Sequence, residues 1–513
     1  MSRTLLSIIG CAAFCAASTA ALAQKSKDTL RMAFQEPIRG IDYYMSPTGE
    51  TSMAQAIVYD SLIAYDEKTN KFEPLLAKAW KRIDDKTLEF EVRTDVKWHD
   101  GQPFSVDDAV YTINWLADPN TKLRFKTFWS WISKAEKFGP NTLRVIALEP
   151  TAFDESRMAY LTAILPKHVH EKMDDKVAFG RAPVGTGMYR TTQVDENKGV
   201  LMERNKAYAH GGPARPVTNV GRLDFAFIPD SGTQMAQFLA GNLDILRDVD
   251  ISQAEHLAKQ LGKAMTLGEG IAWTYIAFDA QGRSGKKPLQ DVRVRKAIAM
   301  SLNRDELRKL LVNEQPLKRN PQSLCWEFQA GCAYGAKLPP YDPEGAKKLL
   351  AEAGYPNGFE LDVTTFLGPM KRFAEAAANQ MSKIGIKAKV DSLALATYAK
   401  KQSDGHIEVI VASYPAGLMP DVSGTASFLF APGPRDYSGD REVHGWADEV
   451  QTTVDPAKRK EIGRKLFDAA TERAYAIPLT GNPVIFVHSS DVNIPPLGSY
   501  TGFGLNVWDV NWK

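Results

Sequence analysis

The residues of this chain that could perform covalent chemistry do not form a known catalytic set. His170-Glu171 is followed by Lys, Met and Asp, so it does not begin an H-E-x-x-H zinc motif. Neither G-x-S-x-G nor a Walker A phosphate loop occurs in the sequence. His168 and His170 stand two residues apart at a predicted helix start, a spacing that does not face one metal ion. Together with the export signal and the further sequence strings described below, this leads us to predict a protein that is not an enzyme and that carries no metal or cofactor.

Aromatic side chains suited to non-covalent recognition are easier to find. Trp273 and Tyr275 lie in the segment from Leu267 to Phe278, which is predicted to be a strand. Residues two apart on a strand share one face, so the two rings are expected side by side.

Gly185-x-Gly187 is no dinucleotide fingerprint, because a third glycine and a following helix are missing.

Length and charge limit the class of protein. A chain of 513 residues is too long for one ordinary core, so two or more domains are expected. Hydrophobic residues at 44% and charged residues at 24% are ordinary for a soluble globular protein. The 63 basic and 61 acidic residues leave a formal net charge of +2, which gives no reason to expect nucleic acid as a partner.

The N-terminus is typical of a secretory signal. Arg3 supplies positive charge, Leu5 to Leu22 is apolar and rich in alanine, and Ala21-Leu22-Ala23 fits an A-x-A site. We expect cleavage after Ala23 and export to the periplasm. A lipoprotein signal ending at Cys11 is the alternative, although the apolar run before this cysteine is short.

The mature chain would keep two cysteines, Cys325 and Cys332, in the string CWEFQAGC. A close, even pair in an exported protein predicts a disulfide that closes a small loop. Metal binding is disfavoured because no histidine or second cysteine pair lies nearby, and two free buried thiols are the other alternative.

One well-specified local unit runs from Glu91 to Leu116. It begins within a predicted strand, because Leu88, Phe90 and Val92 alternate with charged residues. His99-Asp100-Gly101 predicts a turn, in which glycine supplies the positive φ. Ser105 is placed to cap the following helix, and Asp107-Asp108 suits the positive end of its dipole.

The string KWHDGQPFSVDDAVYTINW within this unit closely resembles periplasmic solute-binding proteins of peptide, nickel and opine importers. Two further strings resemble the same family, DVRVRKAIAMSLNRDEL from Asp291 and YDPEGAKKLLAEAGYPNGF from Tyr341. APVGTGMYR also resembles a family string, with Met188 where proline is usual. The resemblance is to bacterial extracellular solute-binding protein family 5, and it covers nearly the whole mature chain.

This resemblance implies an α/β, two-lobed periplasmic binding protein fold of the large type II form, with an extra sublobe inserted in the first lobe. After a signal at 1–23, it implies a first lobe of 24–268 plus 482–513, with the sublobe at about 56–181. Residues 269–481 would form the second lobe. The two lobes would close over a solute by a hinge motion.

The resemblance also implies where the solute binds. In this family the loop after the first strand borders the cleft, and the segment that contains Trp273 crosses it. The ligand-binding residues expected on this basis are Arg39, Tyr43, Tyr44, Trp273, Tyr275, Tyr414 and Asp421, with Arg39 as an anchor for an acidic ligand.

One departure from the family concerns peptide ligands. Peptide binders carry an aspartate just past the strand that ends here at Tyr414, and it pairs with the ammonium group of the peptide. This chain has Pro415, Ala416 and Gly417 there and no acid before Asp421. An amine without its anion loses a charge-assisted bond, so a zwitterionic dipeptide is disfavoured.

The function implied is a periplasmic receptor, acting as a monomer, that captures a peptide-like or other small organic solute. It would deliver this solute to the membrane permease of an ABC importer. One alternative is a binder of a non-peptide solute, such as an opine, an oligosaccharide or an aromatic compound. Another is a periplasmic chaperone or sensor.

Overall fold

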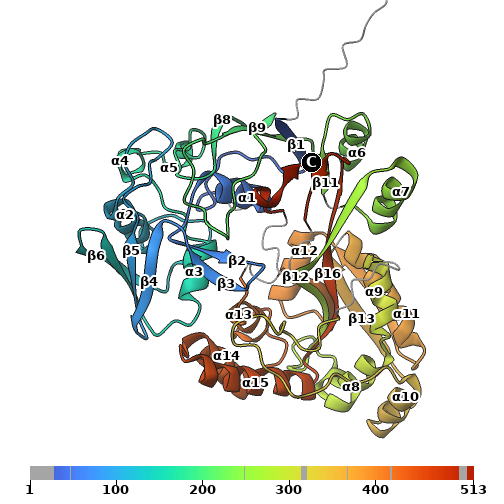
Figure 1. The fold of residues 1–513 in the computed structure, drawn as a ribbon. Coiled ribbons are helices and arrows are strands. Elements are labelled where there is room, and N and C mark those ends of the chain that lie inside the picture. The colour runs from blue at the N-terminus through green and yellow to red at the C-terminus, as the bar shows by residue number, and fades with distance from the viewer. Residues whose placement is uncertain are drawn as a thin grey trace, which may run out of the picture.

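The computed structural model describes residues 28–46, 48–247, 249–312, 320–366, 368–415, 419–495 and 505–513. The expected signal peptide, and the Ala416-Gly417 pair, lie outside these ranges. The chain is a mixed α/β protein, as predicted, and one ten-stranded sheet runs through it (Figure 1). Within the described residues, no helix combines the length and apolar character needed to cross a bilayer.

The large sheet has the strand order β14-β13-β15-β12-β16-β11-β1-β10-β9-β8. Its centre is the antiparallel pair of the two longest strands, β12 (Ala264–Phe278) and β16 (Ala476–His488). On one side lie β11 (Ile245–Arg247), β1 (Thr29–Phe34), β10 (Arg222–Phe227), β9 (Gly199–Arg204) and β8 (Tyr189–Asp195). On the other side lie β15 (Val409–Tyr414), β13 (Glu360–Phe366) and β14 (Lys387–Leu393).

A separate antiparallel sheet lies beside the first half of the large one, at the left of Figure 1. Its order is β4-β5-β7-β6, formed by Ala77–Asp84, Thr87–Val92, Thr142–Ala147 and Ile132–Gly139. A short hairpin of β2 (Ile63–Asp66) and β3 (Lys71–Pro74) precedes it. Four helices belong to this region: α2 (Val106–Ala117), α3 (Asp154–Tyr160), α4 (Lys167–His170) and α5 (Lys176–Phe179).

The remaining helices cover the two ends of the large sheet. Near its first half are α1 (Gly49–Val58), α6 (Ser231–Leu239) and α7 (Ile251–Leu261). Near its second half are α8 (Val292–Ser301), α9 (Arg304–Val312), α10 (Pro343–Glu352), α11 (Pro369–Ser382), α12 (Leu395–Ser403), α13 (Ser423–Phe430), α14 (Arg441–Thr452) and α15 (Pro456–Glu472). The C-terminal hairpin of β17 (Val492–Asn493) and β18 (Asn511–Trp512) returns to the first half.

Local sequence rules explain how many of these helices begin. Aspartate caps seven of them by accepting a backbone N–H at the helix start: Asp175, Asp230, Asp250, Asp291, Asp342, Asp440 and Asp455. At α2 the Asp108 carboxylate accepts from both the backbone N–H (2.9 Å) and the hydroxyl (3.0 Å) of Ser105. Gly101 has φ of 88° in the predicted turn.

The long strands β12 and β16 are the elements that join the two halves of the sheet. Their pairing shifts register between Glu269 and Trp273, where Gly270 lies close to Asn482. We keep the division into a first lobe (24–268 plus 482–513, with the sublobe at about 56–181) and a second lobe (269–481) as a proposal. With this division, the boundary between the two lobes falls inside β12 and β16.

Candidate ligand-binding site

Three of the predicted site residues lie together on two neighbouring strands of the second lobe. Trp273 and Tyr275 are on β12, and Tyr414 on β15 stands opposite Trp273 in the antiparallel register. The Trp273 ring centroid is 5.5 Å from that of Tyr275 and 4.9 Å from that of Tyr414. The prediction that Trp273 and Tyr275 share one face is therefore confirmed, and the register brings Tyr414 to the same group.

This aromatic group is buried and continues into α13. The Phe428 ring is 5.0 Å from Tyr414, and the Arg435 guanidinium lies 4.7 Å from the Phe428 centroid. Burial raises the pKa of Tyr275 well above its usual value and raises that of Tyr414 too, so both phenols stay neutral. The Trp273 Nε1–H is buried and has no hydrogen-bond partner among the described residues.

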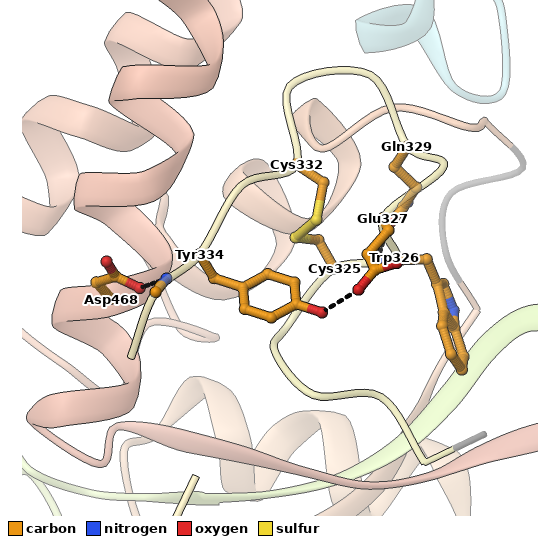
Figure 2. The surroundings of a disulfide bond; sticks show 8 residues. Cys325, Trp326, Glu327, Gln329, Cys332, Tyr334 and Asp468 are labelled. Atoms are coloured by element: carbon orange, nitrogen blue, oxygen red, sulfur yellow. Dashed lines mark hydrogen bonds between the residues drawn. A yellow bond between two sulfur atoms is a disulfide. The ribbon is translucent and has the colours of Figure 1, made fainter. Parts of the chain in front are cut away.

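The disulfide loop supports one edge of this group. Cys325 and Cys332 are bonded, as predicted, and Figure 2 shows Trp326 directed away from the bond. The Trp326 Nε1–H donates to the Ile271 carbonyl on β12 (2.8 Å), two residues before Trp273. The loop is also held from the other side, since Asp468 of α15 accepts the Gly335 N–H at 2.6 Å (Figure 2). The bond therefore braces a loop that is attached to β12.

Asp421 is held inside the second lobe by a buried ion pair. Its two carboxylate oxygens accept from Nη1 and Nη2 of Arg459, at 2.8 and 2.6 Å. Oδ1 also accepts the backbone N–H and the hydroxyl of Ser423, at 2.8 and 2.7 Å. With these contacts made, Asp421 joins the start of α13 to α15 and has little capacity left for a ligand.

The three predicted residues after β1 are separated from one another. Tyr44 is buried in the sublobe core, where its hydroxyl donates to the Ala163 carbonyl (2.6 Å) and its ring packs on Trp115 and Trp129. The Arg39 side chain is 72% exposed, and its nearest carboxylate is that of Glu196, at 3.9 Å. Tyr43 is buried and lines a small cavity of about 20 Å³.

Helix α3 extends this site from the first lobe. It lies beside the second lobe in Figure 1, and the Ala152 N–H just before it donates to the carbonyl of Gln451 on α14 (2.9 Å). Tyr160, at its end, lines the same cavity as Tyr43 and packs against the hydrophobic cores of both lobes. Tyr160 thus stands at the border between the lobes.

Arg157 is the basic residue of α3, and its contacts are with aromatic residues of the sublobe. Its Nη1–H donates to the Phe128 carbonyl (3.2 Å), and its guanidinium lies 4.9 Å and 5.1 Å from the ring centroids of Phe128 and Phe153. Burial lowers the pKa of Arg157 to about 10, while the charge of Asp421 across the lobe border acts in the opposite direction. Sequence reasoning missed this residue, although an arginine within the short stretch SRMAY was a visible signal.

A cavity of about 1070 Å³ lies elsewhere in the first lobe. Its walls include Arg93, Lys97, Arg204 and Arg222, and it contains none of the seven predicted site residues. Solute sites are mostly apolar, with a few placed polar groups, and this cavity is polar and charged. We therefore take the lobe border, with its aromatic group, as the candidate site.

Comparison with known proteins gives a consistent picture. Residues 71–436 match the model of bacterial extracellular solute-binding proteins, family 5 Middle. Heme-binding protein A of Haemophilus influenzae is 26% identical over 68% of this chain and 67% of its own length. Glutathione-binding protein GsiB of Escherichia coli K12 is 23% identical over 90% of both chains. The crystal structure of a dipeptide binding protein from Pseudoalteromonas sp. SM9913 with Met-Leu matches with a TM-score of 0.75 at 20% identity, covering 94% of this chain and 100% of that one.

Proposed function

The chain belongs to family 5 of the bacterial extracellular solute-binding proteins, and from this premise we propose that it receives a small solute for an ABC importer. Proteins of this family bind solutes in the periplasm and are not enzymes. The receptor would capture a peptide-like or other small organic compound between its lobes and deliver it to the membrane permease. The observation that carries this proposal is the family match over residues 71–436.

The proposed contacts are the residues that gather at the lobe border. We retain Tyr43, Trp273, Tyr275 and Tyr414 and add Arg157 and Tyr160. Aromatic walls with a few polar anchors are the usual composition of such a site. Tyr44, Arg39 and Asp421 are left out of the proposed set, because the first is in the sublobe core, the second is exposed and the third is paired with Arg459.

Access to this site would require the lobes to separate. Trp273 and Tyr414 are fully covered in the described arrangement, so a solute cannot reach them without movement. The irregular pairing of β12 and β16 near Gly270 is the proposed hinge, because it lies where both strands cross the lobe boundary. Opening there would expose the aromatic group on one side and α3 on the other.

The chemical class of the solute is broader than peptides. Two relatives are named for heme and for glutathione, and a structural neighbour holds the dipeptide Met-Leu. These three ligands differ in size and charge, so the family alone does not select one. An opine, an oligosaccharide or an aromatic compound stays within the proposal.

Export is part of the proposal. We propose cleavage after Ala23 by the secretory pathway and a periplasmic monomer as the working form. The N-terminal mass of protein recovered from the periplasm would test this directly, with a start at Gln24 as the expected result. A lipid-modified Cys11 would instead indicate an anchored receptor.

The experiment that tests the function identifies what the protein carries. Mature protein purified without denaturant is unfolded, the released compounds are analysed by mass spectrometry, and the refolded protein is titrated with them by calorimetry. We expect one class of compound, bound at a ratio of one and recovered chemically unchanged. Absence of any bound compound, or conversion of the compound during the titration, would contradict a receptor function.

A further inference from the structure

Arg157 carries a half-buried positive charge, and the protein itself satisfies its hydrogen-bond donors poorly. Of its five N–H groups, one on Nη1 donates to the Phe128 carbonyl. Its Nε is buried without a partner, and no carboxylate of the described residues forms an ion pair with it. Withdrawing a charged group partly from water without giving it an anion is costly, so proteins keep such groups mainly where a partner arrives.

Buried arginines of this chain are satisfied internally. Arg459 pairs with Asp421 and Arg215 with Asp60, each through contacts shorter than 3 Å. Arg295 has no carboxylate but donates to four backbone carbonyls, those of Leu289, Gln290, Arg473 and Ala474. Arg157 has a single carbonyl partner, and Arg283 of the second lobe is similar, with an unpaired Nε and one bond to the Pro434 carbonyl; of these two, Arg157 is the one on α3 near the lobe border.

The free part of the Arg157 guanidinium has a defined shape. Two aromatic rings lie near it, those of Phe128 and Phe153, and Nη1 is taken by a carbonyl. Among the donors that are left, the edge formed by Nε and Nη2 presents two parallel N–H groups. This edge matches an anion with two oxygens on one centre, such as a carboxylate or a phosphate.

The position of Arg157 relates this edge to the solute site. It lies on α3, one turn before Tyr160, which packs against both lobes. The acid that faces it from the second lobe, Asp421, is already neutralised by Arg459 and is not within ion-pair distance of Arg157. The lobe border therefore keeps an uncompensated positive charge next to its aromatic walls.

We propose that the captured solute carries a carboxylate or phosphate group, which binds the Nε–Nη2 edge of Arg157. This inference rests on the proposed receptor function and narrows its ligands to acidic organic solutes, including acidic or modified peptides. The acid-anchoring role expected of Arg39 passes to Arg157, because Arg39 is exposed at the surface.

The test is a capture experiment with four forms of the mature protein. Wild type, Arg157→Met, Arg157→Lys and Arg144→Met are stripped of ligand, incubated with a deproteinised small-molecule extract of the source cells, washed and analysed by mass spectrometry. Arg157→Met keeps the apolar stem against the two rings and removes the charge. Arg144 is the matched control, because it also lies over a phenylalanine ring, that of Phe138, but on the sublobe sheet.

We expect wild type and Arg144→Met to retain the same acidic compounds, Arg157→Met at least tenfold less of them, and Arg157→Lys an intermediate amount. The mass of the retained compound distinguishes a carboxylate from a phosphate. Retention by wild type of neutral or cationic compounds alone would overturn the inference whether or not a variant folds. Equal retention by a folded Arg157→Met would do the same, and both results would leave the receptor function intact. If wild type retains nothing, the receptor function and this inference fail together.

Discussion

The buried pair of Arg459 and Asp421 allows a quantitative prediction about the second lobe. Replacing Arg459 by methionine removes both contacts to Asp421, the donation to the Ser423 hydroxyl (2.8 Å) and the Nε donation to the Val450 carbonyl (2.7 Å). Asp421 would then keep only its two contacts to Ser423 and would stay buried as an unpaired carboxylate.

The size of the effect follows from that unpaired charge. Breaking a buried ion pair by removing one partner costs roughly 3–5 kcal/mol of unfolding free energy. For a cooperative unit of about 200 residues, each kcal/mol lowers Tm by about 2–4 °C, so we expect a decrease of about 6–20 °C. Adding Asp421→Asn to Arg459→Met removes the unpaired charge and should recover part of the loss.

The assay is thermal unfolding of the ligand-free protein, followed by circular dichroism, for both single variants and the double variant. Arg464→Met, on the same helix α15, is the control for a change of charge alone. A Tm within about 2 °C of wild type for Arg459→Met, with Asp421→Asn losing ligand affinity at unchanged Tm, would refute this reasoning. That result would return Asp421 to the ligand site, as the sequence analysis expected.

Three further predictions follow from single contacts. Trp273→Ala should weaken solute binding at least tenfold by calorimetry, and unchanged affinity would remove Trp273 from the site. Because the indole is fully buried, the same variant should also lose about 3–5 kcal/mol of unfolding free energy, measured by urea unfolding. Asp42 is buried in the loop after β1, and this burial raises its pKa to about 7; the free energy of unfolding should therefore fall by up to about 4 kcal/mol as the pH rises from about 4 through 7. Asp42→Asn should be more stable than wild type at pH 8 but not at pH 4, as measured by urea unfolding. The same difference in stability between variant and wild type at both pH values would contradict this. The Cys325–Cys332 bond spans seven positions. For a loop of that size, replacing both cysteines by serine should lower the free energy of unfolding by about 2–3 kcal/mol, measured against reduced and oxidised wild type. An unchanged free energy would show that the Trp326 and Asp468 contacts alone hold the loop.

Much of the fold could be predicted from local sequence patterns. The strand before Arg93, the Gly101 turn and the helix after Ser105 follow from alternation, positive φ and capping, which act over a few residues. The shared face of Trp273 and Tyr275 was predictable for the same reason, since it needs only the period of one strand.

Contacts between distant segments were not predictable in this way. The approach of Tyr414 to Trp273 depends on how β15 pairs with β12, which no local pattern specifies. Asp421 was expected to bind ligand because its partner Arg459, on another helix, could not be recognised from the sequence. The proposed role of Arg157 could not be predicted either, because it depends on which groups surround α3 after folding, and no local pattern specifies those contacts.

In the proposed receptor, a solute binds between the two lobes and draws them together. Small-angle scattering of the stripped protein, recorded with and without the compound that co-purifies with it, tests this most directly. The account predicts a smaller radius of gyration at saturating compound. Binding that calorimetry detects at an unchanged radius of gyration would contradict closure over the solute.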